Sequence, residues 1–574
     1  MMRDRSPVSL LAIAGAAVQA VACFLPWSQF AGFPGEMLNS GYPGGARMYV
    51  LFLAVAGLAV LVLDPPRRAA AARAAGAWSL AVSLLTALLI GYAGGGLVNV
   101  GTGAWVAVGG AVALTVGAYL LDLGQDRPLT VWHLPDVPWR QPAEIVLTLG
   151  VAGLALWGFV VGLGIPDSTI ANGDDHVILR AFSLNAITAG SEFLSFLLGI
   201  IGLFVVASRV GIVASVSAVT QRQRAALVVG ASVVAITFPF TQGGSPYGLR
   251  IAASIGVFAA AAVGLNIVVG LAGLLDLGYI AFFGVGAYFA AIYSGTSTSP
   301  IHTTLPFFLV IVLGALVAAV FGVVLGAPTL RLRGDYLAIV TLGFGEIFRI
   351  SVNNFDGSSG PSLTNGPNGV SNIPDLKLPG GFSFGDNHSL FGVELPFQAN
   401  YFFLEILLVA FVMFAFLRLA ESRIGRAWVA IREDELAAAA TGINTTRLKL
   451  LAFALGATLA GMAGTVDAHV VKVAAPDSFT FIESTLLLAA VILGGMGTVP
   501  GALLGASLVY LLPEKLRFLQ DLRLMFFGLT LILIMRLRPE GIIASKRRQR
   551  EFHETDATAL DRAGALDPPP GAHA

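Results

Sequence analysis

Seven polar residues lie within or beside long apolar runs, where their side chains could face the path of a polar solute. Broken membrane helices can add polar groups to such a path from their backbone ends. Ionisable groups at membrane depth cost roughly 2.5 to 3.5 kcal/mol on insertion scales, so they usually face a cavity or a partner. The polar residues are Asn266, Asp276, Asp335, Thr341, Glu346, Asn354 and Glu483. The predicted substrate path comprises four of them: Asn266, Asp276, Thr341 and Glu346. The structural alternative is that the acids Asp276, Asp335 and Glu346 cap helices or lie at the membrane interface.

Several other kinds of chemistry have no support in the sequence. No phosphate-binding loop of the form GxxxxGK[ST] occurs, because none of the five lysines follows a glycine. The seven histidines lack an HExxH motif or a paired ligand spacing and predict no metal site. A single cysteine, Cys23, excludes an intrachain disulfide. We therefore expect no catalytic residues, no cofactor and no enzymatic activity in this chain.

A charged, alanine-rich stretch, REDELAAAATGINTTRLK (432–449), separates two apolar segments. Asp434 is a suitable N-cap, Glu435 favours the positive end of the helix dipole, and Gly442 suits the left-handed position that ends a helix. The pattern predicts a two-turn helix over 434–442, and Asn444 or Thr445 would cap the next helix. A short helix lined by methyl groups could enter a shallow groove on another protein, or could be a connector lying on lipid headgroups.

The composition places these residues in a membrane protein. Of the 574 residues, 56% are hydrophobic and 12% are charged, against about 25% charged in soluble domains, and the mean hydropathy is +0.80. The 34 acidic and 34 basic residues leave no net field to attract nucleic acid. Lipid is the expected surrounding medium, and nucleic-acid binding is not expected.

The elements that must position the polar residues are membrane-spanning helices, each needing about 20 apolar residues. The run at 250–292 is too long for one helix and is interrupted by glycines, which predicts a span followed by a partial or re-entrant helix. Glycines at 497, 501 and 505 predict close contact along one helix face. The fold class is all-α, a polytopic helical membrane protein with broken or re-entrant helices. The other predicted spans are 8–27, 47–63, 76–92, 103–121, 144–164, 187–207, 225–240, 305–327, 335–351, 401–418, 448–470, 481–496, 498–512 and 524–537.

Charge and composition also divide and orient the chain. Residues 1–220 are predicted to form an N-terminal extension of six ordinary spans. Residues 221–543 are predicted to form the functional membrane domain, with broken helices. Residues 544–574 are predicted to be a disordered polar tail. By the positive-inside rule, the loops rich in arginine and lysine lie in the cytoplasm, and so do both termini. The stretches 165–186 and 352–400 then lie outside, the second as an irregular loop.

Five blocks in the second region resemble the integral permease subunits of branched-chain amino-acid ABC importers, specifically the M-type subunit. The resemblance covers about residues 225–543. The blocks are GLNIVVGLAGLLDLGYIAFFGVGAYFAAI (264–292), LRLRGDYLAIVTLGFGEIFRI (330–350), LTNGPNGV (363–370), RIGRAWVAIREDELAAAATGIN (423–444) and PDSFTFIESTLLLAAVILGGMGTVPGALLGA (476–506).

The resemblance implies a role for the alanine-rich stretch as the EAA motif, a short helix that docks into the ATP-binding subunit. Leu436, Ala437 and Ala438 fall on the E-A-A positions and Gly442 on the motif glycine, whereas the acid, Glu435, stands one place early. With Asp434, these residues form the predicted ATPase-coupling helix. The implied partners are two ATP-binding subunits that hydrolyse the ATP, a second homologous permease subunit, and an extracytoplasmic substrate-binding protein that docks at the LTNGPNGV loop.

The predicted function is therefore the translocation path of a branched-chain amino-acid importer in the cell membrane. Two alternatives remain open within transport: a urea or short-amide ABC permease, and an ion-coupled secondary transporter that works alone. A membrane enzyme is the third alternative, and it lacks a catalytic constellation.

Overall fold

The protein is an all-α, multi-pass membrane protein, as the sequence predicts. Among the residues that the structure describes, ten helices are long and apolar enough to cross a membrane, and each strand has only two or three residues. The predicted span 524–537 lies almost entirely outside the described residues, as do the stretch 165–186, both termini and the tail 544–574. The computed structural model describes residues 7–27, 46–63, 67–93, 96–120, 140–163, 190–242, 246–515 with gaps at 297–298, 300, 302, 330–334, 359, 379–381 and 391–392, and isolated positions within 525–543.

The chain forms two compact units, the first made mostly of residues up to Gly248 and the second mostly of residues from Leu249. The predicted roles of 1–220 and 221–543 stay predictions. The first unit contains α1 (Pro7–Ala22), α2 (Ala46–Leu63), α3 (Arg68–Ala93), η1 (Leu97–Asn99), α4 (Thr102–Leu120), α5 (Arg140–Leu163), α8 (Gly190–Val210), α9 (Ile212–Arg222), α10 (Arg224–Thr237) and η2 (Phe238–Gln242).

The first unit differs from a set of ordinary spans at the end of α8. Gly211 has a φ of 93°, and there the chain turns by 85° from α8 into α9. A left-handed φ of this kind is easy only for glycine, which has no Cβ. The hydropathy of 187–207 predicts the first helix and gives no sign of the bend.

The second unit carries the broken helix. Its elements are α11 (Pro246–Asn266), the π-helical turn η3 (Ile267–Leu271), α12 (Ile280–Ile292), α13 (Phe307–Thr329), α14 (Asp335–Asn354), η4 (Gly366–Asn368), α15 (Phe397–Glu421), α16 (Arg423–Glu433), α17 (Glu435–Ala440), α18 (Thr445–Val471), η5 (Pro476–Ser478), α19 (Phe481–Gly494) and α20 (Val499–Lys515). Its short strands are β1 (Val370–Ser371) and β4 (Val473–Ala474). The strands β2 (His388–Leu390) and β3 (Val393–Leu395) lie between these in the sequence, and residues Ser389–Leu395 group with the first unit.

The predicted break in the run 250–292 is present. After α11 the helix widens into η3 and then stops until α12 begins, so residues 272–279 are non-helical. Gly273, with a φ of 72°, holds the left-handed conformation in this segment. Unpaired backbone groups at such a break need partners other than lipid, and polar side chains nearby are placed to provide them.

Glycines bring α19 and α20 together, although one of the three predicted positions is wrong. Gly497 lies before α20, in the left-handed region with a φ of 79°, so it is not on the helix face. Gly501 and Gly505 do form the contact: an added Cβ on Gly505 would lie 1.9 Å from the carbonyl oxygen of Ala490. Gly497 is needed in the turn between the two helices, so it does not lie on the face of α20 with Gly501 and Gly505.

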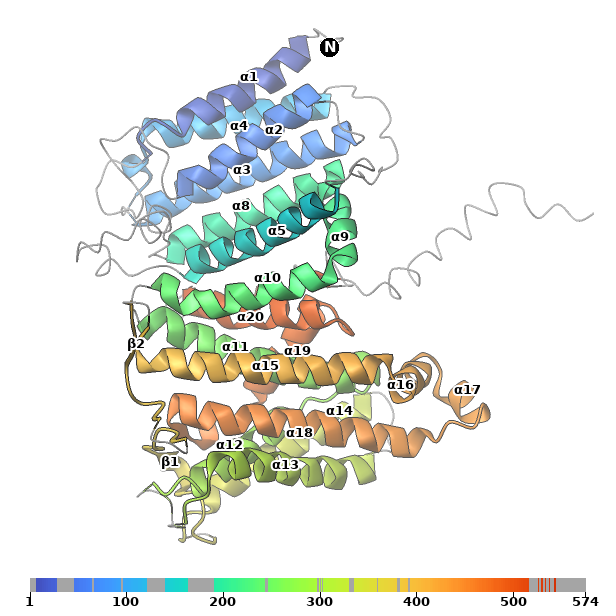
Figure 1. Ribbon diagram of the computed structural model, residues 1–574. Coiled ribbons are helices and arrows are strands. Elements are labelled where there is room, and N and C mark those ends of the chain that lie inside the picture. The colour runs from blue at the N-terminus through green and yellow to red at the C-terminus, as the bar shows by residue number, and fades with distance from the viewer. Residues whose placement is uncertain are drawn as a thin grey trace, which may run out of the picture. The chain divides into compact units, whose positions relative to one another are not determined.

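Two ends of the second unit differ in character. Strands β1 and β4 pair antiparallel, with Val370 opposite Ala474, within an otherwise irregular stretch as predicted for 352–400. At the other end of the long helices, α16 and α17 project from the bundle (Figure 1). Helix α18 runs between these ends and packs against both α12 and α13.

Candidate functional site

The predicted short helix over 434–442 exists and has the predicted caps. Asp434 is the N-cap of α17, and its Oδ1 accepts hydrogen bonds from the backbone N–H groups of Leu436 (2.8 Å) and Ala437 (3.0 Å). Gly442 has a φ of 88°, and the N–H of Ile443 returns to the carbonyl of Ala438. A helix start leaves four N–H groups unpaired, and an N-cap side chain of this kind satisfies some of them. The local structure is confirmed, and the coupling role stays a prediction.

A second helix and an ion pair hold α17 in place. Helix α16 precedes α17 and was not predicted. Its Trp428 is fully buried and donates from Nε1 to the carbonyl of Leu448 at 2.7 Å. Lys449 in α18 donates to Glu435 at 2.5 Å, with the lysine side chain only 8% exposed. Glu435, the acid that stands one place early in the motif, therefore forms its ion pair within its own chain.

The outward side of α17 is made of methyl groups. Leu436 is 67% exposed, and Ala437, Ala439 and Ala440 are exposed as well, whereas Ala438 is buried against the rest of the loop. Exposed apolar groups on a rigid, capped helix form a small convex surface that fits a shallow groove. The six predicted coupling residues thus lie together at one end of the second unit.

Arg432 connects this loop to the broken helix. Its guanidinium donates from Nη1 to the carbonyl of Gly270 in η3 at 2.7 Å. The side chain also crosses Gly273, where an added Cβ would lie 2.3 Å from Cγ of Arg432. Arg432 is two residues before the cap of α17, so a displacement of α17 would be transmitted to the break over a short path.

Asn266 ties the break to the turn between α19 and α20. The side chain is fully buried; its Nδ2 donates to the carbonyl of Thr498 at 3.0 Å, and its Oδ1 accepts from the N–H of Gly497 at 2.8 Å. Both polar atoms of the amide are therefore used within the protein. The predicted path residue joins two non-helical segments that are more than 200 positions apart in the sequence.

Asp276 and Thr341 cap backbone groups on the other side of the break. Asp276 Oδ1 accepts from the N–H of Gly278 at 2.9 Å, and Thr341 Oγ1 accepts from the N–H of Leu277 at 3.0 Å. Both side chains are fully buried. Within the described residues, Asp276 Oδ2 has no hydrogen-bond partner. The break thus has one buried acceptor left over.

The remaining predicted polar residues are dispersed. Glu346 is 39% exposed and pairs with Arg349 in the next turn at 2.9 Å. Asn354 donates to the carbonyl of Ile350 in its own helix. The side chain of Asp335 lies outside the described residues. The structure brings Asn266, Asp276 and Thr341 to one broken helix and separates Glu346 from their hydrogen bonds.

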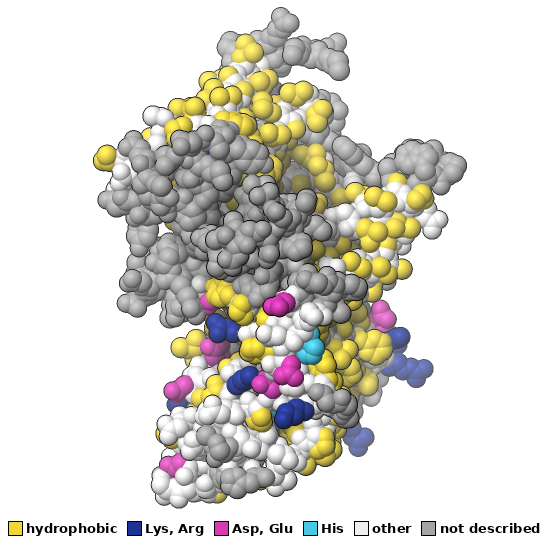
Figure 2. Space-filling model, turned by 60° about the vertical axis from the view of Figure 1, so that its left-hand side comes forward, with side chains coloured by type: hydrophobic (Ala, Val, Ile, Leu, Met, Phe, Trp, Pro, Cys, Tyr) yellow, Lys and Arg dark blue, Asp and Glu magenta, His cyan; other side chains and the backbone are white. Residues whose placement is uncertain are grey.

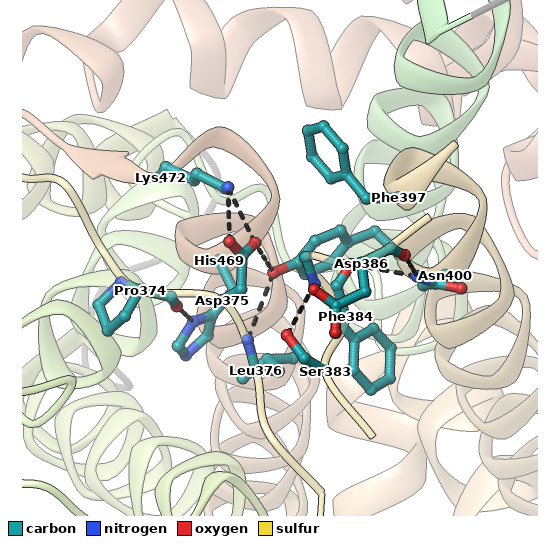
Figure 3. A network of polar contacts seen from close by, with 12 residues as sticks. Pro374, Asp375, Leu376, Ser383, Phe384, Asp386, Phe397, Asn400, His469 and Lys472 are labelled. Atoms are coloured by element: carbon teal, nitrogen blue, oxygen red, sulfur yellow. Dashed lines mark hydrogen bonds and ion pairs between the residues drawn. The ribbon is translucent and has the colours of Figure 1, made fainter. Parts of the chain in front are cut away.

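The end of the second unit that carries β1 has a polar network of its own (Figure 3). Lys472, in the left-handed conformation directly after α18, contacts both oxygens of Asp375, at 2.8 and 2.9 Å. Tyr401 in α15 donates to Asp375 at 2.8 Å, and the Lys472 ammonium lies 4.9 Å from the ring centroid of Phe397. The network joins the loop that precedes α15, the start of α15 and the end of α18, on a face where acidic and basic side chains lie close together (Figure 2).

The predicted docking loop LTNGPNGV lies at the same end. Asn365, Gly366 and Gly369 all have a φ near 60°. An added Cβ on Gly369 would lie 2.4 Å from the carbonyl oxygen of Ala474, next to the β1–β4 pairing. Glycine is therefore required at 369 by both its conformation and the close backbone approach. The loop is a defined structure, and docking there stays a prediction.

Two acidic residues inside the membrane helices are missing from the predicted set. Glu405 lies in α15 and is 1% exposed, and Asp467 lies near the end of α18. An acid within the run FFLEILLVAFVMF is a clear signal for Glu405, because an ionisable residue is rare in such a run. Asp467 is less visible, since the segment around it contains polar residues.

The family model and the curated relatives that match this chain describe the same kind of protein. The family model described as branched-chain amino acid transport system / permease component matches residues 247–535. Among the described residues, no group of three or more His, Cys, Asp or Glu side chains is arranged to hold a metal ion. No solved structure matches the chain.

Two kinds of curated relative match. The high-affinity branched-chain amino acid transport system permease protein LivM of Salmonella typhimurium is 39% identical over 338 residues, 57% of this chain and 76% of the relative. LivM of Escherichia coli K12 is also 39% identical, over 55% of this chain and 74% of the relative. LivH of Salmonella typhimurium, a permease protein of the same system, is 26% identical over 44% of this chain and 79% of the relative.

Proposed function

The chain belongs to the family of branched-chain amino acid transport system permease components, and on that premise we propose that it forms the translocation path of an ATP-driven importer of branched-chain amino acids. The observation that carries the ATP-driven part is α17, a short capped helix with exposed methyl groups at one end of the second unit. This projecting helix favours a transporter with a partner subunit over one that works alone.

In this proposal α17 docks into a groove on a separate ATP-binding subunit. Leu436 and the exposed alanines supply the contact surface, while Asp434, Gly442 and the Glu435–Lys449 ion pair keep the helix rigid. A rigid α17 would transmit a displacement of the ATP-binding subunit to the membrane helices, whereas a flexible segment would not. ATP is hydrolysed by the partners, and this chain makes and breaks no covalent bonds.

The hydrogen bonds described above supply a route from α17 to the broken helix. Closure of the ATP-binding subunits would displace α17 and Arg432, and Arg432 would move the carbonyl of Gly270. Asn266 would pass this movement to the turn at Gly497 and Thr498. Broken helices packed around a central path are suited to alternating access, in which one group of helices rocks against another.

The remaining components follow from the same proposal. We place the chain in the cell membrane, with both termini and α17 in the cytoplasm and the β1 end outside. Two ATP-binding subunits, a second homologous permease and an extracytoplasmic substrate-binding protein would complete the importer. The Asp375–Lys472 network and the LTNGPNGV loop lie where that binding protein would deliver its cargo.

The test is ATP-driven uptake by vesicles that contain the complete complex. Gly442→Val should abolish most uptake while the complex still assembles and hydrolyses ATP, because a β-branched residue is strongly disfavoured at a φ of 88°. Ala438→Arg, at a buried position, should do the same. Gly109→Val in α4 is the matched control, since an added Cβ there meets open space.

Three outcomes would contradict the proposal. Unchanged uptake in the Gly442→Val complex would remove the coupling role of α17. Uptake of labelled urea in place of labelled leucine by the unaltered complex would replace the substrate. Accumulation of leucine by the isolated chain under an ion gradient, without ATP, would replace the energy source.

A further inference from the structure

The segment 541–543 contacts the end of α19 and is here called the C-terminal clip. The backbone N–H of Ile542 donates to the carbonyl of Leu493 at 2.8 Å, and the N–H of Ile543 donates to the carbonyl of Gly494 at 2.9 Å. The last carbonyl groups of a helix have no partner within the helix itself. The clip therefore satisfies two of these carbonyls in α19 from a distant part of the chain.

Gly541, at the start of the clip, lies directly on the backbone at the end of α19. It is buried and has a φ of 84°. An added Cβ on Gly541 would lie 2.6 Å from the Cα of Gly495, 2.7 Å from the backbone nitrogen of Gly495 and 2.9 Å from the carbonyl oxygen of Ile492. All three are backbone atoms, so a side chain at position 541 would displace the clip. The contact requires glycine both for its conformation and for its close approach.

Thr498 joins the clip to the turn between α19 and α20. Its Oγ1 lies 3.4 Å from the carbonyl oxygen of Ile543 and 3.0 Å from that of Gly495, and it accepts from the N–H of Gly501 at 3.2 Å. A threonine hydroxyl has one donor proton, which either carbonyl can accept. Thr498 and Ile543 are 45 positions apart in the sequence. Thr498 is therefore a point where the clip meets the turn 495–498.

The turn 495–498 is also held by the broken helix. Asn266 accepts from the N–H of Gly497 and donates to the carbonyl of Thr498. Thr498 thus uses its carbonyl for the broken helix and its hydroxyl for the clip. The turn has two sets of partners, one in the route from α17 and one in the segment that follows the last predicted span.

The turn needs such partners because its own backbone is not stiff. Gly495 and Gly497 have φ values of 123° and 79°, and glycine has more backbone freedom than any other residue. An unsupported turn of this kind would change shape when Asn266 moved, and the two helices would not follow. Helices α19 and α20 are already in close contact, since an added Cβ on Gly494 would lie 1.9 Å from the carbonyl oxygen of Gly501. The clip fixes the turn to this helix pair.

We propose that the C-terminal clip holds the turn 495–498 rigid, so that a displacement of Asn266 moves α19, α20 and the clip together. Gly541 and Thr498 are then positioning residues for transport, because they act through the turn that Asn266 moves. This inference rests on the proposed function, in which Asn266 passes on the movement of α17. It extends the coupling route beyond the residues that the family model matches.

The experiment measures the number of leucine molecules taken up per ATP hydrolysed by vesicles that contain the complete complex. Gly541→Ala should lower this ratio by about fivefold or more, because the added Cβ displaces the clip and two hydrogen bonds to α19 are lost. ATP hydrolysis, and the subunit composition seen by native mass spectrometry, should stay the same. Gly528→Ala is the matched control and should not change the ratio, since an added Cβ at Gly528 meets open space.

A second pair of variants separates the hydroxyl of Thr498 from the size of its side chain. Thr498→Val keeps the shape and removes the hydrogen bonds of the hydroxyl, so leucine taken up per ATP should fall by about threefold. Thr498→Ser keeps the hydroxyl and should retain more of the ratio than Thr498→Val. This pair decides the question if the Gly541→Ala complex does not assemble: equal ratios in the two Thr498 variants would overturn the proposal.

A double variant distinguishes coupling from a merely structural cap on α19. Arg432→Gln and Gly541→Ala interrupt the same route if the clip acts on the movement that comes from α17. The double variant should then lose no more of the ratio than the larger single loss. Losses that multiply would show that the clip acts apart from this route, which overturns the proposal.

The proposed function and the role of the clip fail in different ways. If the unaltered complex takes up no leucine with ATP, the proposed function fails. If it takes up leucine and an assembled Gly541→Ala complex has the same ratio of leucine to ATP, only the role of the clip fails.

Discussion

Each of the two compact units contains a buried glutamate in a membrane helix, and their surroundings differ sharply. Glu144 in α5 is 4% exposed and accepts hydrogen bonds from Arg140 (3.2 Å), Arg222 (3.1 Å) and Gln223 (3.2 Å). Glu405 in α15 is 1% exposed and has no partner among the described residues. The burial of Glu144 is compensated by partners within the protein, whereas the burial of an unpaired carboxylate carries a desolvation cost.

The family match follows the same division. It covers 247–535, which contains the broken helix, α17 and Glu405, and leaves out almost all of the first unit. The buried amide of Gln19 in the first unit is likewise satisfied within its own helices, by Ser79 at 2.6 Å and Ser83 at 2.9 Å. The family match therefore lies almost entirely in the second unit, and the buried Glu144 and Gln19 of the first unit have hydrogen-bond partners within the protein.

Among variants that compare the two glutamates, Glu405→Leu is expected to have the largest effect on transport. Replacing a buried unpaired carboxylate with an apolar side chain removes a desolvation cost, so the midpoint of thermal unfolding should stay the same or rise. ATP-driven uptake should fall by at least about tenfold. A variant that loses stability and uptake together would instead make Glu405 a structural residue like Glu144.

The next effect is expected from Arg432→Gln, which removes the charged donor to the carbonyl of Gly270. Hydrogen bonds to charged groups contribute about 1.5–3 kcal/mol, so the number of leucine molecules moved per ATP should fall by about tenfold. Arg426→Gln, on the exposed side of the same helix, is the control. Tight coupling in the Arg432→Gln complex would show that α17 acts on the membrane helices by another route.

A smaller effect is expected from Lys472→Met. Its ion pair with Asp375 is partly exposed, with 36% and 27% of the side chains accessible, and such pairs contribute about 0.2–1 kcal/mol. The uptake rate at limiting substrate-binding protein should fall by no more than about fivefold. Lys377→Met, an exposed residue of the same loop, serves for comparison. A full loss of uptake would show that this network is essential for transport.

The smallest effect on transport is expected from Glu144→Gln. Loss of the charge breaks the pairing with Arg140 and Arg222, so the midpoint of thermal unfolding of the chain should fall. Uptake per assembled complex should be unchanged, because the solute does not meet this residue. A specific loss of uptake at normal stability would place the first unit in the translocation path.

The sequence by itself determined the elements whose causes are local. Hydropathy over about 20 residues locates membrane helices, and cap residues fix α17, as Asp434 and Gly442 show. Glycines within an apolar run predicted the break after α11. A cap or a break depends on residues within a few positions of each other, so its physical cause can be read directly from the chain.

Only the tertiary structure decided which distant residues meet. Asn266 reaches a turn more than 200 positions away, Arg432 reaches Gly270, and Arg222 reaches Glu144. Nothing within a few positions of these residues specifies their neighbours, because helix packing sets the contacts. The bend at Gly211 shows the same limit, since hydropathy measures whether a segment can enter a membrane and carries no information on its direction.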